Sequence, residues 1–108
     1  MPSKHNNFQV LKSLERDSRC TQRQLSDNLG ISLGKANYCL KSLIEKGLVK
    51  IIKFKNSNKK SQYSYLLTAK GIEEKAKLTV EFIKIKTKEY DNLRKEIENL
   101  REDVRSQR

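Results

Sequence analysis

The sequence has little of what enzymes with deep clefts and membrane proteins need. Its 108 residues include two cysteines, one histidine, one proline and no tryptophan, and apolar residues make up 35% of the chain. So little apolar material leaves no large buried core, which disfavours a large substrate cleft. No apolar run is long enough to span a membrane, and residues 1–7 lack the apolar segment of a signal peptide. We therefore expect a cytoplasmic protein without membrane attachment.

Patterns for catalysis and metal binding are also missing. Cys20 and Cys39 lack the spacing of a zinc site or of a disulfide framework. Cys39 is expected to pack as a small apolar side chain, whereas Cys20, near a predicted loop, is expected to be the more exposed of the two. His5 is the single histidine, and most acids lie on one highly charged segment, so no catalytic set can be assembled. We predict no enzymatic activity, no metal and no cofactor.

Positive charge is plentiful and unevenly distributed. Lysine and arginine number 24 against 13 acids, a formal net charge of +11. Residues 48–71 hold six lysines and no acid, whereas residues 72–108 hold ten basic and nine acidic side chains. A concentrated basic region suits a polyanion, and a balanced, densely charged segment suits a solvated helix or a coiled coil.

The first half of the chain predicts three short helices. Apolar residues at helical spacing predict a helix over residues 5–18. A capping box that begins at Thr21 predicts a second helix that stops at Gly30. Ser32 is a second N-cap, and the helix behind it ends at Gly47. Two helices joined by a short turn that contains glycine are typical of a helix-turn-helix.

A β-hairpin is predicted directly after these helices. Residues 48–54 and 63–67 are rich in β-branched, aromatic and other apolar side chains, and a polar segment over residues 56–61 joins them. A hairpin with a basic tip in this place makes the winged version of the helix-turn-helix. We therefore predict a mainly α fold with a small β-hairpin, in which a winged helix-turn-helix domain covers residues 1–67.

The last third, residues 68–108, predicts a long C-terminal coiled-coil helix that forms a parallel homodimer. The helix is expected from Ala69 to about Ser106, after an N-cap at Thr68. Branched side chains and tyrosine at a positions with leucine at d favour two parallel strands, although Lys86 interrupts one d position. Acids at g positions and arginines at e positions would attract each other only in the parallel arrangement. The apolar dimerisation residues are Ile83, Tyr90, Leu93, Ile97, Leu100 and Val104.

The polar face of the third predicted helix is a candidate DNA-reading surface. Asparagine can pair with adenine, and lysine can reach guanine or a phosphate, so Lys35, Asn37 and Tyr38 are the predicted base contacts. An ordinary solvated face is the alternative, but residues 30–42 contain no acid. The predicted phosphate and wing contacts are Arg23, Ser32, Lys41, Lys53, Lys55, Lys59 and Lys60.

Residues 32–49 resemble the recognition helix of MarR-type winged-helix regulators. Residues 65–71 resemble the junction between wing and helix in that family, with its Leu-Thr-x-x-Gly pattern. The resemblance covers about residues 8–100 and is closest to the small exopolysaccharide-associated MarR subgroup. It implies a dimeric regulator of transcription whose base- and phosphate-contacting face includes Lys35, Asn37, Tyr38 and Lys41. It also implies a role near genes for extracellular polysaccharide.

The chain departs from that family in length. Typical MarR proteins are longer, and their N- and C-terminal helices enclose a pocket for phenolic effectors. With one short N-terminal helix and one long C-terminal helix, this chain is predicted to bind double-stranded DNA and a second copy of itself, without a small-molecule effector. Two other readings stay open: a protein-interaction module built on the winged helix, and a non-specific nucleoid or RNA-binding protein.

Overall fold

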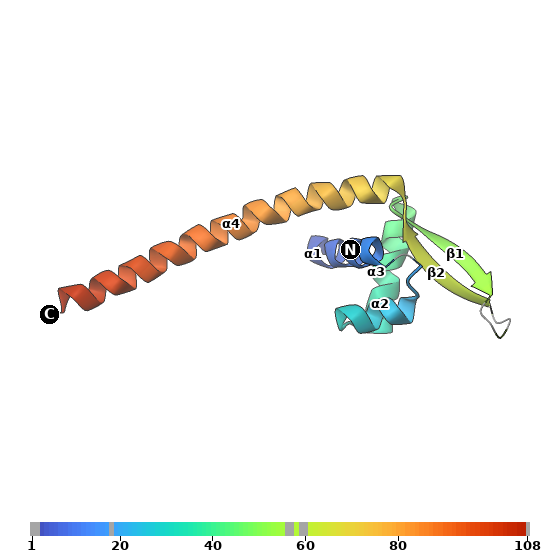
Figure 1. Ribbon diagram of the computed structural model, residues 1–108, viewed down its shortest axis with the longest axis horizontal. Helices are drawn as coiled ribbons and strands as arrows, with labels where there is room; N and C mark the ends of the chain where they lie inside the picture. Colours follow the sequence, from blue (N-terminus) through green and yellow to red (C-terminus); the bar gives the residue numbers. More distant parts are fainter. Residues whose placement is uncertain (1–2, 18, 56–57, 59–60, 108) are drawn as a thin grey trace. The chain divides into compact units, whose positions relative to one another are not determined.

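The computed structural model describes residues 3–17, 19–55, 58 and 61–107. The chain order is α1 (Lys4–Arg16), α2 (Gln22–Leu29), α3 (Leu33–Glu45), β1 (Val49–Lys55), β2 (Ser61–Leu67) and α4 (Ala69–Ser106). Figure 1 shows the three short helices gathered beside the base of the hairpin. The predicted winged helix-turn-helix is therefore confirmed, and the long C-terminal helix has the predicted bounds.

Side-chain caps fix where the short helices begin. The capping box at Thr21 is formed in both directions: Thr21 Oγ1 accepts from the Gln24 backbone N–H at 3.1 Å, and Gln24 Oε1 accepts from the Thr21 N–H at 2.9 Å. Ser3 and Ser32 cap α1 and α3 in the same way, each through its hydroxyl oxygen. These caps satisfy backbone donors that the first turn of a helix leaves without partners.

Two glycines end α2 and α3 in the left-handed conformation, as their positions predict. Gly30 follows α2 with a φ of 65°, and Gly47 follows α3 with a φ of 75°. Side chains other than glycine adopt this region at a cost, because the Cβ crowds the neighbouring carbonyl. The turn between α2 and α3 is held further by the Ile31 N–H, which donates to the Ser26 carbonyl at 3.1 Å.

The hydrophobic core lies between the three short helices and the base of the hairpin. Its fully or nearly fully buried side chains include Val10, Leu11, Leu14, Leu25, Ala36, Cys39, Leu40, Leu43 and Val49. Burial of this kind contributes roughly 1.5–3 kcal/mol for each large aliphatic side chain. The core therefore positions α3 with one face inward and the other outward.

Cys20 corrects one prediction, because it is buried rather than exposed. Cys20 lies just before α2 and forms an antiparallel bridge with Tyr65 of β2, in which the Tyr65 N–H donates to the Cys20 carbonyl at 2.9 Å. This pairing draws the thiol into the core, away from solvent. Burial, with Asp17 nearby, raises the pKa of the Cys20 thiol.

The hairpin is antiparallel, and its register runs from Val49 opposite Leu67 to Lys55 opposite Ser61. The second strand therefore begins two residues earlier than the sequence pattern predicts, because polar residues in the predicted turn continue the ladder. Figure 1 shows the hairpin extending away from the helices at its far end. Contacts of β2 with α1 and α2 anchor its base.

The start of α4 is locked to the turn between α3 and β1. Thr68 donates twice across this junction, from its N–H to the Leu48 carbonyl at 3.1 Å and from its hydroxyl to the Gly47 carbonyl at 2.7 Å. Its hydroxyl oxygen accepts from the Gly71 N–H at 3.0 Å. Gly71 passes so close to the Leu48 carbonyl that a Cβ there would overlap it.

The chain divides into two compact units, Met1–Leu78 and Thr79–Arg108. The first unit therefore includes the opening turns of α4, where Leu78 is buried and Lys75 pairs with Glu15 of α1 at 2.9 Å. The second unit consists of the rest of α4. None of the helices within the described residues is both long and apolar enough to cross a membrane.

Candidate nucleic-acid interface

The outer face of α3 is polar, basic and free of acids over its first three turns. Lys35, Tyr38 and Lys41 follow one another at helical spacing and are all exposed, and half-buried Asn37 lies beside them. The opposite face carries the buried residues Ala36, Cys39, Leu40 and Leu43. The core thus fixes the rotation of α3, and this rotation presents the predicted base-contacting residues on one side.

Ser32 has a structural role at the start of this face. Its hydroxyl oxygen accepts from the Lys35 N–H at 3.1 Å and so caps α3. A serine hydroxyl that accepts in this way still has its own hydrogen to donate. The predicted phosphate contact at Ser32 is therefore chemically compatible with the cap.

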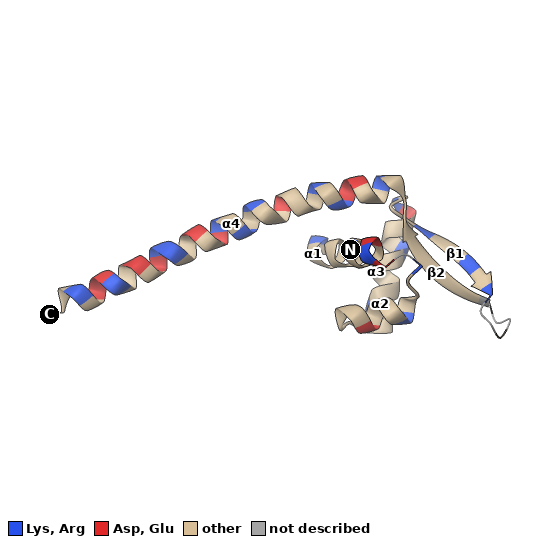
Figure 2. Ribbon diagram, in the orientation of Figure 1, with Lys and Arg blue, Asp and Glu red and all other residues tan. Residues whose placement is uncertain are grey.

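The wing carries basic side chains on its solvent face. Lys53 and Lys55 of β1 are exposed, and Lys53 lies opposite Tyr63 of β2 in the register. Figure 2 shows basic positions along β1 with no acidic position on either strand. The predicted tip contacts Lys59 and Lys60 lie outside the described residues.

Arg23 is exposed near the start of α2 and lines an open groove that the sequence pattern did not predict. Gln62 and Tyr63 of β2 line the same groove. They are separated from Arg23 by some forty positions in the chain, so no local pattern joins them. The signal that could have found Tyr63 is the alternation of β2, which places it on the strand face that also carries Lys53.

The thiol of Cys39 lies directly behind this interface. Burial raises the pKa of the Cys39 thiol, and nearby Lys35 opposes the rise. A buried thiol with a raised pKa is a poor nucleophile, which fits a packing role. Within the described residues, no three histidine, cysteine, aspartate or glutamate side chains come together to hold a metal ion.

A separate cavity of about 330 Å³ lies among α1, α3 and the first turns of α4. Its polar lining includes Lys46, Lys70 and Asn7, and the buried Asn7 Oδ1 has no hydrogen-bond partner among the described residues. The residues of the proposed DNA-reading face do not line it. That the chain has no small-molecule effector stays a prediction.

Comparison with known proteins agrees with this architecture. Residues 4–50 match a protein family model described as winged helix-turn-helix DNA-binding. No curated protein matches the chain. The match covers 47 of the 108 residues, from α1 to the start of β1.

Solved structures extend the likeness beyond the helix-turn-helix. A PadR-like transcriptional regulator from Bacillus cereus is 17% identical with a TM-score of 0.75, over 82% of this chain and 90% of that one. The Multiple Antibiotic Resistance Repressor, MarR, is 27% identical with a TM-score of 0.59, over 68% and 51%. The PcaV regulator from Streptomyces coelicolor, solved with its natural ligand, is 18% identical with a TM-score of 0.65, over 75% and 56%. The chain has the fold of MarR- and PadR-type transcriptional regulators and spans about half the length of the MarR-type structures.

Proposed function

We propose that the chain is a homodimeric transcriptional regulator that binds an inverted-repeat DNA operator in a sequence-specific manner. One observation carries this proposal: the exposed face of α3 presents Lys35, Asn37, Tyr38 and Lys41 together, without an acid, in a winged helix-turn-helix. A recognition helix reads base edges in the major groove with the residues near its N-terminus. Lys35 and Asn37 stand there, and both can donate to purine bases.

Phosphate contacts supply most of the affinity in this proposal. The proposed set consists of Arg23, Ser32, Lys41, Lys53 and Lys55, together with Lys59 and Lys60. Each neutralised phosphate releases counterions, so binding should weaken steeply as salt rises.

The resemblance to the exopolysaccharide-associated MarR subgroup supports target genes for extracellular polysaccharide.

The second unit supports dimerisation through α4. Its apolar stripe is largely exposed in a single chain, with exposed fractions from 42% at Ile97 to 67% at Val104. An isolated helix gains little stability from propensity alone, so this segment needs a partner for its apolar side. A second copy supplies one, because the stripe repeats at a and d positions and matches itself. The stripe consists of Ile83, Tyr90, Leu93, Ile97, Leu100 and Val104.

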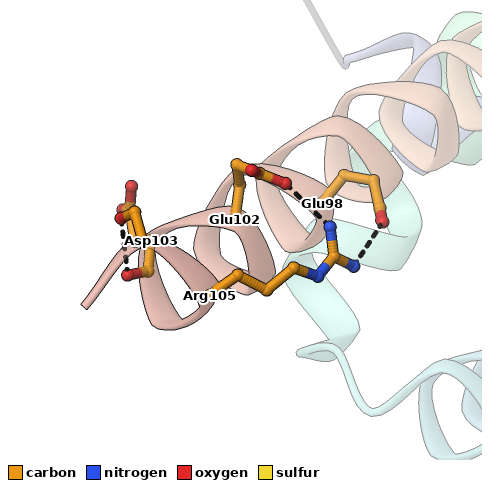
Figure 3. Close-up of polar contacts among 5 residues, drawn as sticks. Glu98, Glu102, Asp103 and Arg105 are labelled. Atoms are coloured by element: carbon orange, nitrogen blue, oxygen red, sulfur yellow. Dashed lines mark hydrogen bonds and ion pairs between the residues drawn. The ribbon is translucent and has the colours of Figure 1, made fainter. Parts of the chain in front are cut away.

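Charges beside the stripe favour a parallel pair. Figure 3 shows that Arg105 forms ion pairs within its own helix, with Glu102 at 2.7 Å and Glu98 at 3.8 Å. These three residues lie at the outer b and f positions of the heptad. By contrast, Glu96 at g and Arg101 at e form no ion pair with any other described residue of the chain. In a parallel pair Glu96 faces Arg101 of the second copy, and in an antiparallel pair like charges meet.

Cysteine crosslinking tests the orientation of the pair. In a parallel, in-register coiled coil identical d residues face each other, so Leu93→Cys should form a disulfide-linked dimer on mild oxidation. Glu102→Cys, at an outer position, is the matched control and should stay monomeric on a reducing-agent-free gel. Equal crosslinking of both variants, or none of either, would contradict the parallel pair.

Selection of duplexes from fragmented host genomic DNA, at about 150 mM salt, tests the DNA function. The proposal predicts enrichment of inverted repeats whose half-sites lie about 34 Å, or a multiple of it, apart. Fragments retained without a shared motif would instead support a non-specific nucleic-acid-binding protein. No retention would favour a protein-interaction module.

A further inference from the structure

An open groove of about 340 Å³ lies between the start of α2 and the wing strand β2. One wall is formed by Thr21, Gln22 and Arg23, and the other by Gln62, Tyr63 and Tyr65. All six belong to the first compact unit. The groove therefore joins two elements that are separate in sequence, the first helix of the helix-turn-helix and the wing.

Two hydrogen bonds hold the groove in place. On one side the Tyr65 N–H donates to the Cys20 carbonyl at 2.9 Å and fixes β2 to the residue before Thr21. On the other side Gln22 Nε2 donates to the Leu33 carbonyl at 3.1 Å and fixes the groove to the first residue of α3. The groove walls are thus tied both to the wing and to the beginning of the recognition helix.

The side chains around the groove suit a single anion with oxygen acceptors. Arg23 is exposed and carries a full positive charge, and the Tyr63 side chain is 55% exposed. The Gln62 amide is exposed on the same strand, and no acid is among the residues that line the groove. Arginine, tyrosine and glutamine are all hydrogen-bond donors to the phosphates of DNA.

We propose that this groove seats one phosphate of the DNA backbone in each half-site. Arg23 pairs with its charge, and the Tyr63 hydroxyl and the Gln62 amide donate to its oxygens. This inference rests on the proposed DNA-binding function and adds Gln62 and Tyr63 to it. Because Gln22 ties the groove to Leu33, the seated phosphate sets how far α3 advances along the major groove.

Two variants separate the charge from the hydrogen bond. Arg23→Ala removes one phosphate contact, so the slope of log affinity against log salt should become shallower by about 1. Tyr63→Phe removes only a hydroxyl, so affinity for the operator should fall roughly tenfold while the salt slope stays constant. Lys95→Ala is the matched control, because it removes an exposed basic side chain at an outer position of α4, and it should leave operator binding unchanged.

Duplexes with one uncharged methylphosphonate per half-site locate the phosphate. The wild-type protein should lose affinity when the seated phosphate is neutralised, and Arg23→Ala should lose nothing further at that position. Losses that add at every position would overturn the assignment. Thermal melting of each variant checks that it is folded.

The outcomes distinguish the groove from the function. If the wild-type protein prefers its operator to a scrambled duplex but Arg23→Ala and Tyr63→Phe both bind like the Lys95→Ala control, the groove assignment alone is wrong. If the wild-type protein has no such preference, the proposed function is wrong.

Discussion

Gly71→Ala tests how the start of α4 packs against the turn between α3 and β1. A Cβ at residue 71 would overlap the Leu48 carbonyl oxygen and lie 3.1 Å from a methyl group of Leu67. The carbonyl cannot move freely, because the Thr68 N–H donates to it and the Leu48 N–H is itself bonded to the Leu43 carbonyl. Relief of the overlap therefore requires α4 or β1 to shift as a whole.

The expected loss follows from three contributions. Overpacking costs about 1–3 kcal/mol, and we expect a cost near the upper end of this range because the added Cβ overlaps backbone atoms. Weakening the two Thr68 hydrogen bonds across the junction costs about 1 kcal/mol more. Alanine regains about 1 kcal/mol of helix propensity. The free energy of unfolding should fall by about 2–3 kcal/mol, which lowers the melting temperature of a domain of this size by roughly 10–20 °C.

Gly34→Ala is the matched control, because it adds the same methyl group within α3. A Cβ there meets no atom within 4 Å, and its φ is not in the left-handed region. This variant should be as stable as the wild type or up to about 1 kcal/mol more stable. Both are measured by urea unfolding, followed by circular dichroism at one fixed protein concentration, since a dimer's stability depends on concentration. A Gly71→Ala protein as stable as Gly34→Ala would refute the reasoning.

Four further predictions rest on buried or base-reading side chains. Ser64 is fully buried, and its hydroxyl has no hydrogen-bond partner among the described residues. Ser64→Ala should therefore raise the free energy of unfolding by about 1 kcal/mol. A lower free energy of unfolding in a urea titration would count against this. Burial raises the pKa of the Cys20 and Cys39 thiols. At pH 8 both should therefore react slowly with iodoacetamide until urea unfolds the protein. Fast labelling of the native protein would contradict this prediction. As pH rises, the thiols of the unfolded chain lose their protons before the buried thiols of the folded protein do. The free energy of unfolding should therefore fall as pH rises above about 8.5. Asn37→Ala should relax base preference at one position per half-site by about 1–3 kcal/mol in a binding-site selection, and an unchanged preference would remove Asn37 from base reading.

Local signals made most of the fold predictable. Caps at Thr21 and Ser32, glycines at 30 and 47 and the apolar periodicity each act over a few residues, and each is present in the structure. The exposed face of α3 was predictable for the same reason, because the buried stripe determines what remains outside. A coiled coil involves a second copy, so its residues remain predictions from the heptad pattern.

Long-range contacts were not predictable from these signals. Cys20 is buried because its carbonyl pairs with Tyr65, forty-five positions away, and nothing near Cys20 in the sequence indicates that partner. The groove between Arg23 and Tyr63 depends on the same pairing. The reason for Gly71 also lies elsewhere, in the carbonyl of Leu48.

The affinity of the wild-type chain for three duplexes tests the central claim most directly. The duplexes are the inverted repeat enriched by genomic selection, one of its half-sites alone and a scrambled sequence of equal length, all at one salt concentration. A homodimeric, sequence-reading regulator should bind the repeat at least about 1,000-fold more tightly than the scrambled duplex, with the half-site between them. Equal affinity for all three would contradict the account.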